Sequence, residues 1–527
     1  MTTAIGPLPA EEAAWAQADA PPTLTLIDLF NDTPTLTSHL CVQVAAGNWL
    51  DAFLLAVGVH QIAEDHWQRG RLGLRRAGGH LTQMDGRAAR LAGGVAEGAD
   101  RLDTWARANM PAVSRRGADL GPLAALIRDL CRSAMQVGGE PDRTALYRRA
   151  GAVSHAINTE PRREDDIVRL PSCFRSFDQR LEDVVRLARS FAERWPDRRQ
   201  PLTVVGVRTS GSYLGPATAV ALEGLGYSNI TTATVRPGWP TPPVVRAALG
   251  DRAAAGSRFL IVDDPPMTGR SLADAVGQVR RAGTVGADRI AVLIALGPSG
   301  EADADRDLLG GAPVISLPWD RWAVHDQLTA GHVGQALTGL LPGGSWVRRT
   351  DAITSPTRPR RGHVRSVFRV ELVDGATGAA VAETVAVEGV GLGYLGRHAV
   401  AVARAAPELV PPVFGFADGM LYRHWLPGGR ERGDGSATAG TGGTNGSCAH
   451  GAGANGSGAG GTGGDNQAWA DRARFLGSVA GSIAGSIAMR RHVLAVPVDR
   501  SLVLRGRQPA WEVASRLISR SLGPLAL

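Results

Sequence analysis

The sequence contains no lysine, and all 57 residues counted as Lys or Arg are arginines. An ATP site that holds its phosphates through a strand lysine is therefore excluded. The replacement of every lysine, beside 67 glycines and abundant alanine, is typical of a coding bias and carries no functional meaning by itself.

Cysteine is also scarce. The four cysteines share no C-x-x-C spacing, which indicates no zinc site and predicts a reduced, cytoplasmic protein; they are Cys41, Cys131, Cys173 and Cys448. No apolar run approaches the length that crosses a bilayer, and the segment after Met1 has neither the basic start nor the apolar core of a secretory signal. We therefore expect a soluble protein with no membrane partner.

Aromatic residues make up only 5% of the chain, and no basic cluster alternates with them. The net charge of +7 therefore does not predict a nucleic-acid partner, because stacking grooves need both features. A positive field would instead favour a small anionic substrate.

The chain has enough length and apolar content for several domains, with 527 residues of which 44% are hydrophobic. Five apolar strand candidates alternate with helical segments and predict a doubly wound, mostly parallel α/β sheet; they are residues 202–207, 229–235, 258–264, 289–296 and 312–317. A Gly/Ser-rich stretch that cannot form a core predicts a flexible linker. The expected parts are 1–165 (mainly helical), 166–345 (α/β), 360–427 (small α+β), 428–467 (linker) and 468–527 (helical tail).

The most informative segment is RFLIVDDPPMTGRS, residues 258–271. Its apolar run predicts a buried parallel strand that ends at Asp263 and Asp264. The helical pattern from Ser271 to Gly283 predicts that the intervening turn opens a helix, whose first N–H groups favour a phosphate. The segment therefore suits a ligand with hydroxyls or a metal at one end and a phosphate at the other.

This segment resembles the signature of type I phosphoribosyltransferases: a strand, two acidic residues, three variable positions, Thr-Gly, one more residue and then Ser or Thr. The resemblance implies that Asp263 and Asp264 are the catalytic pair and hold the ribose hydroxyls of phosphoribosyl pyrophosphate (PRPP), directly or through Mg²⁺. It also implies that the turn binds the 5-phosphate of PRPP through Met267, Thr268, Gly269, Arg270 and Ser271.

A second strand candidate is followed by a polar turn and a helical stretch. This arrangement resembles the pyrophosphate loop of the same family, and the residues implied to bind the diphosphate are Arg208, Thr209, Ser210 and Gly211. After the strand at 229–235, Arg236 begins a Pro-rich loop. The resemblance makes Arg236 the candidate cation of a mobile loop that closes over the diphosphate.

The resemblance implies an enzyme that moves a 5-phosphoribosyl group between PRPP and a small-molecule acceptor with Mg²⁺; a homodimer is one expected assembly. Two departures concern the acceptor. Met267 stands where purine-type members carry an acidic base, and the lysine that orotate-type members use is absent. A second interpretation, favoured by Met267, is a regulatory module that senses PRPP or a nucleotide without turnover.

Three other groups have two interpretations each. His60 and Glu64, four residues apart, suit a metal site or, preferably, a solvated helix face. Arg175 and Asp178 suit a substrate hood or a structural ion pair. The run WDRWAVHD suits packing at the domain edge or contact with an acceptor base, through Trp319, Asp320, Trp322, His325 and Asp326.

Residues 364–427 resemble the small lobe of aminoglycoside-phosphotransferase-type kinases, with two expected hairpins. Glu388 stands where a phosphate-binding lysine is expected and no catalytic motif follows, so we do not expect phosphate transfer from ATP. The glycines of a G-x-G-x-x-G pattern, Gly391, Gly393 and Gly396, follow these strands. A dinucleotide site needs a parallel βαβ unit, which a hairpin does not supply.

Overall fold

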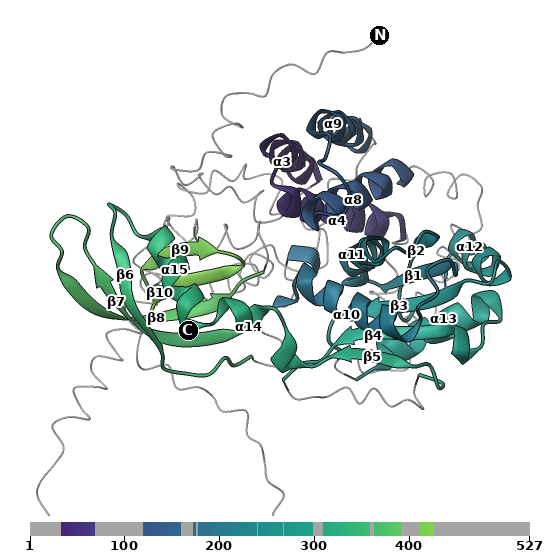
Figure 1. Ribbon diagram of the computed structural model, residues 1–527. Coiled ribbons are helices and arrows are strands. Elements are labelled where there is room, and N and C mark those ends of the chain that lie inside the picture. Colours follow the sequence, from purple (N-terminus) through teal and green to yellow (C-terminus); the bar gives the residue numbers. More distant parts are fainter. Residues whose placement is uncertain are drawn as a thin grey trace, which may run out of the picture.

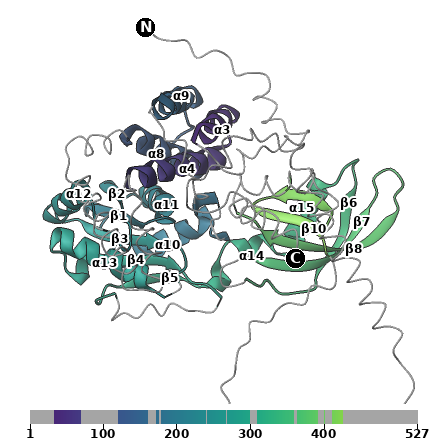
Figure 2. The same ribbon diagram turned by 180° about the vertical axis from the view of Figure 1, so that it is seen from behind.

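The computed structural model of the chain describes residues 33–68, 120–159, 172–174, 178–239, 241–266, 268–298, 309–358, 363–391, Val400 and 411–425. The expected linker (428–467) and tail (468–527) lie outside these residues. A parallel sheet and an antiparallel sheet lie side by side, and the N-terminal helices lie on one side of the part that contains the parallel sheet (Figures 1 and 2). No helix of the described part is long and apolar enough to cross a membrane.

The parallel sheet has five strands in the order β2-β1-β3-β4-β5. They are β1 (Leu202–Val207), β2 (Ile230–Val235), β3 (Arg258–Asp263), β4 (Ile290–Ala295) and β5 (Val314–Leu317). Every residue of β1 and β4 is buried, as expected for parallel strands covered on both faces. The predicted α/β arrangement is therefore confirmed for this part of the chain.

Helices cover both faces of this sheet. On one face lie α10 (Leu181–Arg194) and α11 (Gly211–Gly224), and on the other α12 (Pro243–Ala254) and α13 (Arg270–Gly283). Because neighbouring side chains of a strand point to opposite faces, each strand supplies two cores. Val204 and Leu260 pack in the core with α10 and α11, whereas Val205 and Ile261 pack in the core with α12 and α13.

The strand order reverses between β1 and β3, because β1 connects to β2 on one side while β3 joins β1 on the other. Open α/β sheets bind ligands at such a switch point, at the carboxyl ends of the strands. The two turns singled out in the sequence follow β1 and β3. The fold therefore places both of them at the switch point.

The N-terminal helices are α3 (Thr33–Ala46), α4 (Trp49–Gln68), α8 (Gly121–Ala134) and α9 (Arg143–Thr159). Helices α4 and α8 both contact α11 of the parallel-sheet part. Phe53, Leu54 and Val57 of α4 are buried, together with most of their neighbours on the same helix. Helix α4 is thus a central element of the core rather than a surface helix.

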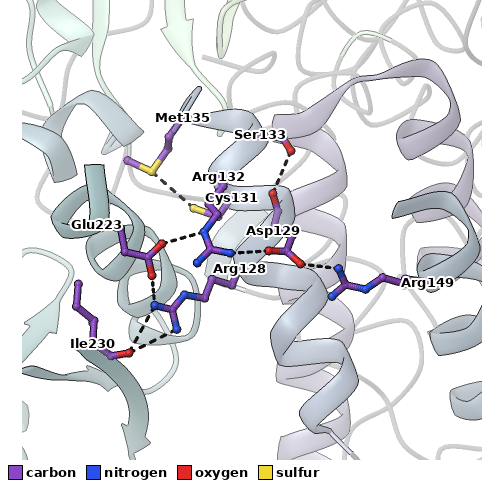
Figure 3. Close-up of polar contacts among 9 residues, drawn as sticks. All are labelled: Arg128, Asp129, Cys131, Arg132, Ser133, Met135, Arg149, Glu223 and Ile230. Carbon is purple, nitrogen blue, oxygen red and sulfur yellow. Dashed lines mark hydrogen bonds and ion pairs between the residues drawn. The ribbon is translucent and has the colours of Figure 1, made fainter. Parts of the chain in front are cut away.

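Ion pairs fasten α8 to the helices on either side of it (Figure 3). Arg128 and Arg132 of α8 both donate to Glu223 on α11, the second over 2.9 Å from Nε to Oε2. Asp129 accepts from Arg132 and from Arg149 of α9. The helical part and the parallel-sheet part are therefore joined by charged contacts as well as by apolar packing.

The antiparallel sheet has the order β6-β7-β8-β10-β9. Its strands are β6 (Trp346–Ala352), β7 (Arg365–Val373), β8 (Ala380–Gly389), β9 (Val413–Ala417) and β10 (Met420–His424), and α15 (Ala330–Leu340) contacts β6 and β9. The short helix α14 (Val324–Gln327) and three 3-10 turns complete the described elements: η1 (Ser172–Phe174), η3 (Ala287–Arg289) and η4 (Trp319–Arg321).

Both hairpins predicted for this region are present, β7 with β8 and β9 with β10. The hairpins alone do not establish a kinase relationship. Because β8 pairs only in an antiparallel sheet, Gly391 does not follow a parallel strand. Glu388 lies in β8 and forms a buried ion pair with Arg423 of β10, with 2.9 Å between Oε1 and Nη2.

Candidate active site

The acidic pair lies at the carboxyl end of β3. Asp263 is its last residue and is 7% exposed, and Asp264 follows it and is half-buried. The hydroxyl of Ser210 donates to Oδ1 of Asp263 over 2.5 Å, and the backbone N–H of Asp264 donates to the same oxygen over 2.9 Å. The turn after β1 and the turn after β3 are therefore directly joined at the switch point.

Both carboxyl groups are poorly solvated. Burial raises the pKa of Asp263 well above its usual range, the charge of Asp264 raises it further, and the Ser210 hydroxyl opposes the shift. Burial also raises the pKa of Asp264, whereas the positive charge of Arg358 lowers it. Adjacent buried carboxylates repel each other, and this arrangement favours a bound cation.

The turn after β3 is shaped for an anion. Gly269 precedes α13 in a left-handed conformation with φ of 69°, where other residues are strained. Thr268, Arg270 and Ser271 are exposed around it at the start of the helix. The first N–H groups of α13 and these side chains can therefore reach a phosphate from solvent. Met267 lies outside the described residues.

The turn after β1 packs backbone against backbone. A Cβ at Gly206 would lie 2.2 Å from the carbonyl oxygen of Gly211, and a Cβ at Gly211 would lie 2.3 Å from the carbonyl carbon of Gly206. Only glycine permits this approach. Ser210 is buried and Thr209 is partly exposed. Of the side chains in this loop, that of Thr209 is the most open to a ligand.

The guanidinium of Arg208 does not point to solvent. Its side chain is fully buried, and Nη1 lies 3.1 Å from Oε1 of Glu64 on α4. The hydroxyl of Thr234 donates to the same glutamate oxygen over 2.8 Å. The structure thus places Arg208 between the loop and the N-terminal helices, where it holds the loop in position.

The preferred interpretation of His60 and Glu64 as a solvated helix face is wrong. Glu64 is only 8% exposed, and Nδ1 of His60 lies 3.6 Å from its Oε2. Burial lowers the pKa of His60, which keeps the imidazole neutral. The charged partner of Glu64 is Arg208, and no group of three or more His, Cys, Asp or Glu side chains in the described part could hold a metal.

Arg236, the candidate for a mobile loop, lies beside α13. Its guanidinium is 5.0 Å from the ring centre of Trp239, and its carbonyl oxygen accepts from Nε2 of Gln278 over 3.0 Å. The backbone N–H of Gly238 donates to Asp274 over 2.6 Å. These contacts hold the start of the loop against α13.

Sequence reasoning missed Arg358, which lies between β6 and β7. Its guanidinium carbon is 5.2 Å from the ring centre of Trp322 and 5.7 Å from that of Trp319. Its Nη1 lies close to Gly297, just after β4. Arg358 therefore reaches the carboxyl edge of the parallel sheet from the antiparallel part, and no local pattern marks it.

The residues after β5 mainly pack against one another. Trp322 is 1% exposed, and its ring centre lies 4.9 Å from that of Trp319. Nε2 of His325 lies 3.0 Å from the carbonyl oxygen of Trp319. Asp320 is exposed on η4, and Asp326 forms an exposed ion pair with Arg186. The packing interpretation of this run is therefore the better one.

Asp178 has structural partners among the described residues. Its Oδ1 lies 2.7 Å from Nδ1 of His363, and its Oδ2 accepts from the N–H of Val364 over 2.6 Å. These bonds join the segment before α10 to the start of β7. Arg175, the predicted partner, lies outside the described residues.

One comparison with known proteins gives a partial relative of the chain. An adenine phosphoribosyltransferase of Streptomyces galbus is 36% identical over 129 residues, which cover 70% of that protein and 23% of this chain. No protein-family model and no solved structure matches the chain.

Proposed function

The chain belongs to the phosphoribosyltransferase family through the part that it shares with the Streptomyces galbus protein, and from this premise we propose that it transfers a 5-phosphoribosyl group between PRPP and a small acceptor. The observation that carries the proposal is the hydrogen bond from Ser210 to Asp263. It joins the diphosphate-type loop to the ribose-type acidic pair at the switch point, where such sheets bind ligands.

In this proposal the ligand lies across three elements. The carboxylates of Asp263 and Asp264 accept hydrogen bonds from the ribose hydroxyls. Thr268, Ser271 and the first N–H groups of α13 hold the 5-phosphate. Thr209 and the backbone of its loop bind the diphosphate, Arg208 keeps that loop in place, and Gly211 allows it to pack on β1.

The residues present suit Mg²⁺. Asp263 and Asp264 are two poorly solvated, adjacent carboxylates that repel each other unless a cation is bound. Mg²⁺ needs only one or two protein carboxylates when substrate phosphates and water complete its coordination shell. Asp263 and Asp264 would hold the ion, which would neutralise negative charge on the departing diphosphate.

The transfer itself forms one bond and breaks one bond. The lone pair of the acceptor forms a bond to C1 of the ribose, the bond from C1 to the diphosphate oxygen breaks, and its electron pair leaves with the diphosphate. The proton of the acceptor passes to water. The carboxylates beside the ring stabilise the positive charge that develops on the ribose.

Pyrophosphate release tests the proposal. We expect the full chain to bind PRPP with Mg²⁺ and to release pyrophosphate when a suitable acceptor is present, with adenine tried first because of the relative's name. Tight binding without release from a broad acceptor pool would support the sensing module instead.

The double variant Asp263→Asn, Asp264→Asn identifies the site. Each lost charge-assisted hydrogen bond is worth about 1.5–3 kcal/mol, so we expect PRPP affinity to fall by about two to four decades. Asp251→Asn changes an exposed carboxylate on α12 and serves as the matched control. Unchanged PRPP affinity in a folded double variant, measured by calorimetry, would refute the assignment.

A further inference from the structure

Two polar side chains near Asp264 have no role in the phosphoribosyl chemistry proposed above. They are Arg358, from the antiparallel part, and Tyr213, from the first turn of α11. Among the described residues, neither the Nε of Arg358 nor the hydroxyl of Tyr213 has a hydrogen-bond partner, although both atoms are buried. Buried polar atoms are nearly always paired, so two such atoms around one site indicate a missing ligand.

The tryptophans hold the guanidinium of Arg358 in place. The ring centres of Trp322 and Trp319 lie 5.2 and 5.7 Å from its central carbon. Aromatic rings stabilise a guanidinium through its charge, while its N–H groups remain available for a planar anion. Trp322 is itself almost fully buried, so this support is rigid.

Tyr213 supplies a second, neutral donor. The residue is 3% exposed, and burial together with the charge of Asp264 raises the pKa of its hydroxyl well above the usual range. The hydroxyl therefore keeps its proton and can donate a hydrogen bond. Burial lowers the pKa of the Arg358 guanidinium, and the charges of Asp178 and Asp264 oppose this shift.

The position of Arg358 relative to β3 indicates which end of the reaction it serves. The diphosphate loop follows β1, on one side of β3. Arg358 lies against Gly297 and Trp319, which follow β4 and β5 on the other side of β3. An acceptor must approach the ribose carbon from the face that the diphosphate does not occupy, which is the side of Arg358.

We propose that Arg358 binds a carboxylate of the acceptor, with Tyr213 of α11 as a second donor from the β1 side, so that the acceptor is a small ring compound that carries an acidic group. This inference rests on the proposed phosphoribosyl transfer. A guanidinium is the side chain best suited to bind a carboxylate through two parallel hydrogen bonds. Through this role of Arg358, the antiparallel part of the chain would take part in recognition of the acceptor.

Matched pairs of acceptors test the inference with the full chain. Nicotinate is compared with nicotinamide, and orotate with uracil, with adenine as a further neutral base; pyrophosphate release is measured with Mg²⁺ and excess PRPP. We expect acids to be used at least about tenfold better than their neutral counterparts, because one charge-assisted bond is lost with the carboxylate. Equal or better use of the neutral compounds would overturn the inference.

Two variants separate binding from packing. Arg358→Gln should lower the use of the preferred acid by about ten- to a hundredfold and the use of its neutral counterpart far less, because it removes the charge that binds the acid. Arg369→Gln, on an exposed position of β7, is the control and should change neither. An equal loss for acidic and neutral acceptors in Arg358→Gln would indicate a structural role and overturn the inference.

Two calorimetric titrations distinguish a failure of this inference from a failure of the proposed function: the acids are titrated without PRPP, and PRPP is titrated with Mg²⁺. If the wild-type chain does not bind PRPP with Mg²⁺, the phosphoribosyl assignment fails, while acid binding that depends on Arg358 would still show the acidic subsite. If PRPP binds and no acid of the panel binds or reacts, only the acidic subsite fails.

Discussion

Asp183 is a buried carboxylate outside the proposed catalytic machinery. It lies in the first turn of α10, where Oδ2 accepts from the N–H of Arg180 over 2.9 Å and Oδ1 accepts from the N–H of Ala323 over 2.7 Å. Burial raises the pKa of its carboxyl to about 6, although these hydrogen bonds oppose the shift. One side chain thus joins α10 to the segment after β5 and makes the stability of this junction depend on pH.

The raised pKa of Asp183 fixes the sign of this dependence. The folded state holds the proton more tightly than the unfolded chain, so the stabilisation is complete below about pH 4 and is lost as the pH rises to about 6. Asp183→Asn does not titrate. We expect its free energy of unfolding, relative to wild type, to increase by about 2–3 kcal/mol between pH 4 and pH 7.

Urea unfolding of both proteins at pH 4, 5.5 and 7 measures this difference. The absolute stability of Asp183→Asn should be lower at pH 4, because an amide cannot accept both backbone hydrogen bonds. Asp251→Asn, at an exposed position, should run parallel to wild type. Parallel curves for Asp183→Asn would contradict the assignment of a raised pKa to this group.

At the scale of elements, the sequence predicted β1, β3 and β4 well because these strands are short apolar runs buried on both faces. Strand β3 ends at Asp263 as expected. Helix boundaries were less accurate. Helix α11 begins at Gly211, within the turn assigned to the diphosphate loop, because Gly206 and Gly211 let the helix start directly against β1. A glycine inside an apolar strand was the available signal of that contact.

Two glycines of α11 provide a matched test of this close approach. A Cβ at Gly211 would overlap the backbone of Gly206 at 2.3 Å, whereas a Cβ at Gly215 would meet it only at 3.7 Å, an ordinary contact. We expect Gly211→Ala to destabilise the chain by more than about 2 kcal/mol and to weaken PRPP binding, because β1 and the loop must separate. Gly215→Ala should be neutral or stabilising by about 0.5–1 kcal/mol.

Thermal melts and PRPP calorimetry on the two glycine variants decide the matter. A folded Gly211→Ala with wild-type affinity would show that the loop can be displaced without loss of the site. A similar loss in both variants would show that alanine is simply not tolerated in α11, and the close approach would then have no special importance.

At the scale of the whole molecule, two contacts at the candidate site could not be predicted from the sequence. Glu64 and Arg208 are far apart in the chain, and so are Arg358 and Trp319; each pair is brought together by the packing of separate parts of the protein. Local patterns locate residues on elements. They do not report which charged partner another part of the chain supplies, so neither the burial of Glu64 nor the position of Arg358 follows from its local sequence.

The ion pair of Glu64 and Arg208 joins the N-terminal helices to the loop that we propose binds the diphosphate. Glu64→Gln keeps a group that can accept from Thr234 and removes the charge that faces the buried guanidinium. A buried charge without its partner is unfavourable, so we expect the loop to shift and PRPP affinity to fall about tenfold, with a loss of stability of about 3 kcal/mol. Calorimetry and thermal melts measure the two effects.

The control is Glu223, which forms the charged contact between α11 and α8 of the N-terminal helices. Glu223→Gln removes the acid that accepts from Arg128 and Arg132 (Figure 3), away from the diphosphate loop, and should lower stability without changing PRPP affinity. In a double-mutant cycle, the free-energy effects of Glu64→Gln and Arg208→Gln should be non-additive by about 0.5–3 kcal/mol, because each substitution removes the same ion pair. Additive effects, or equal changes of affinity in the two glutamate variants, would mean that the helices support the fold without positioning the loop.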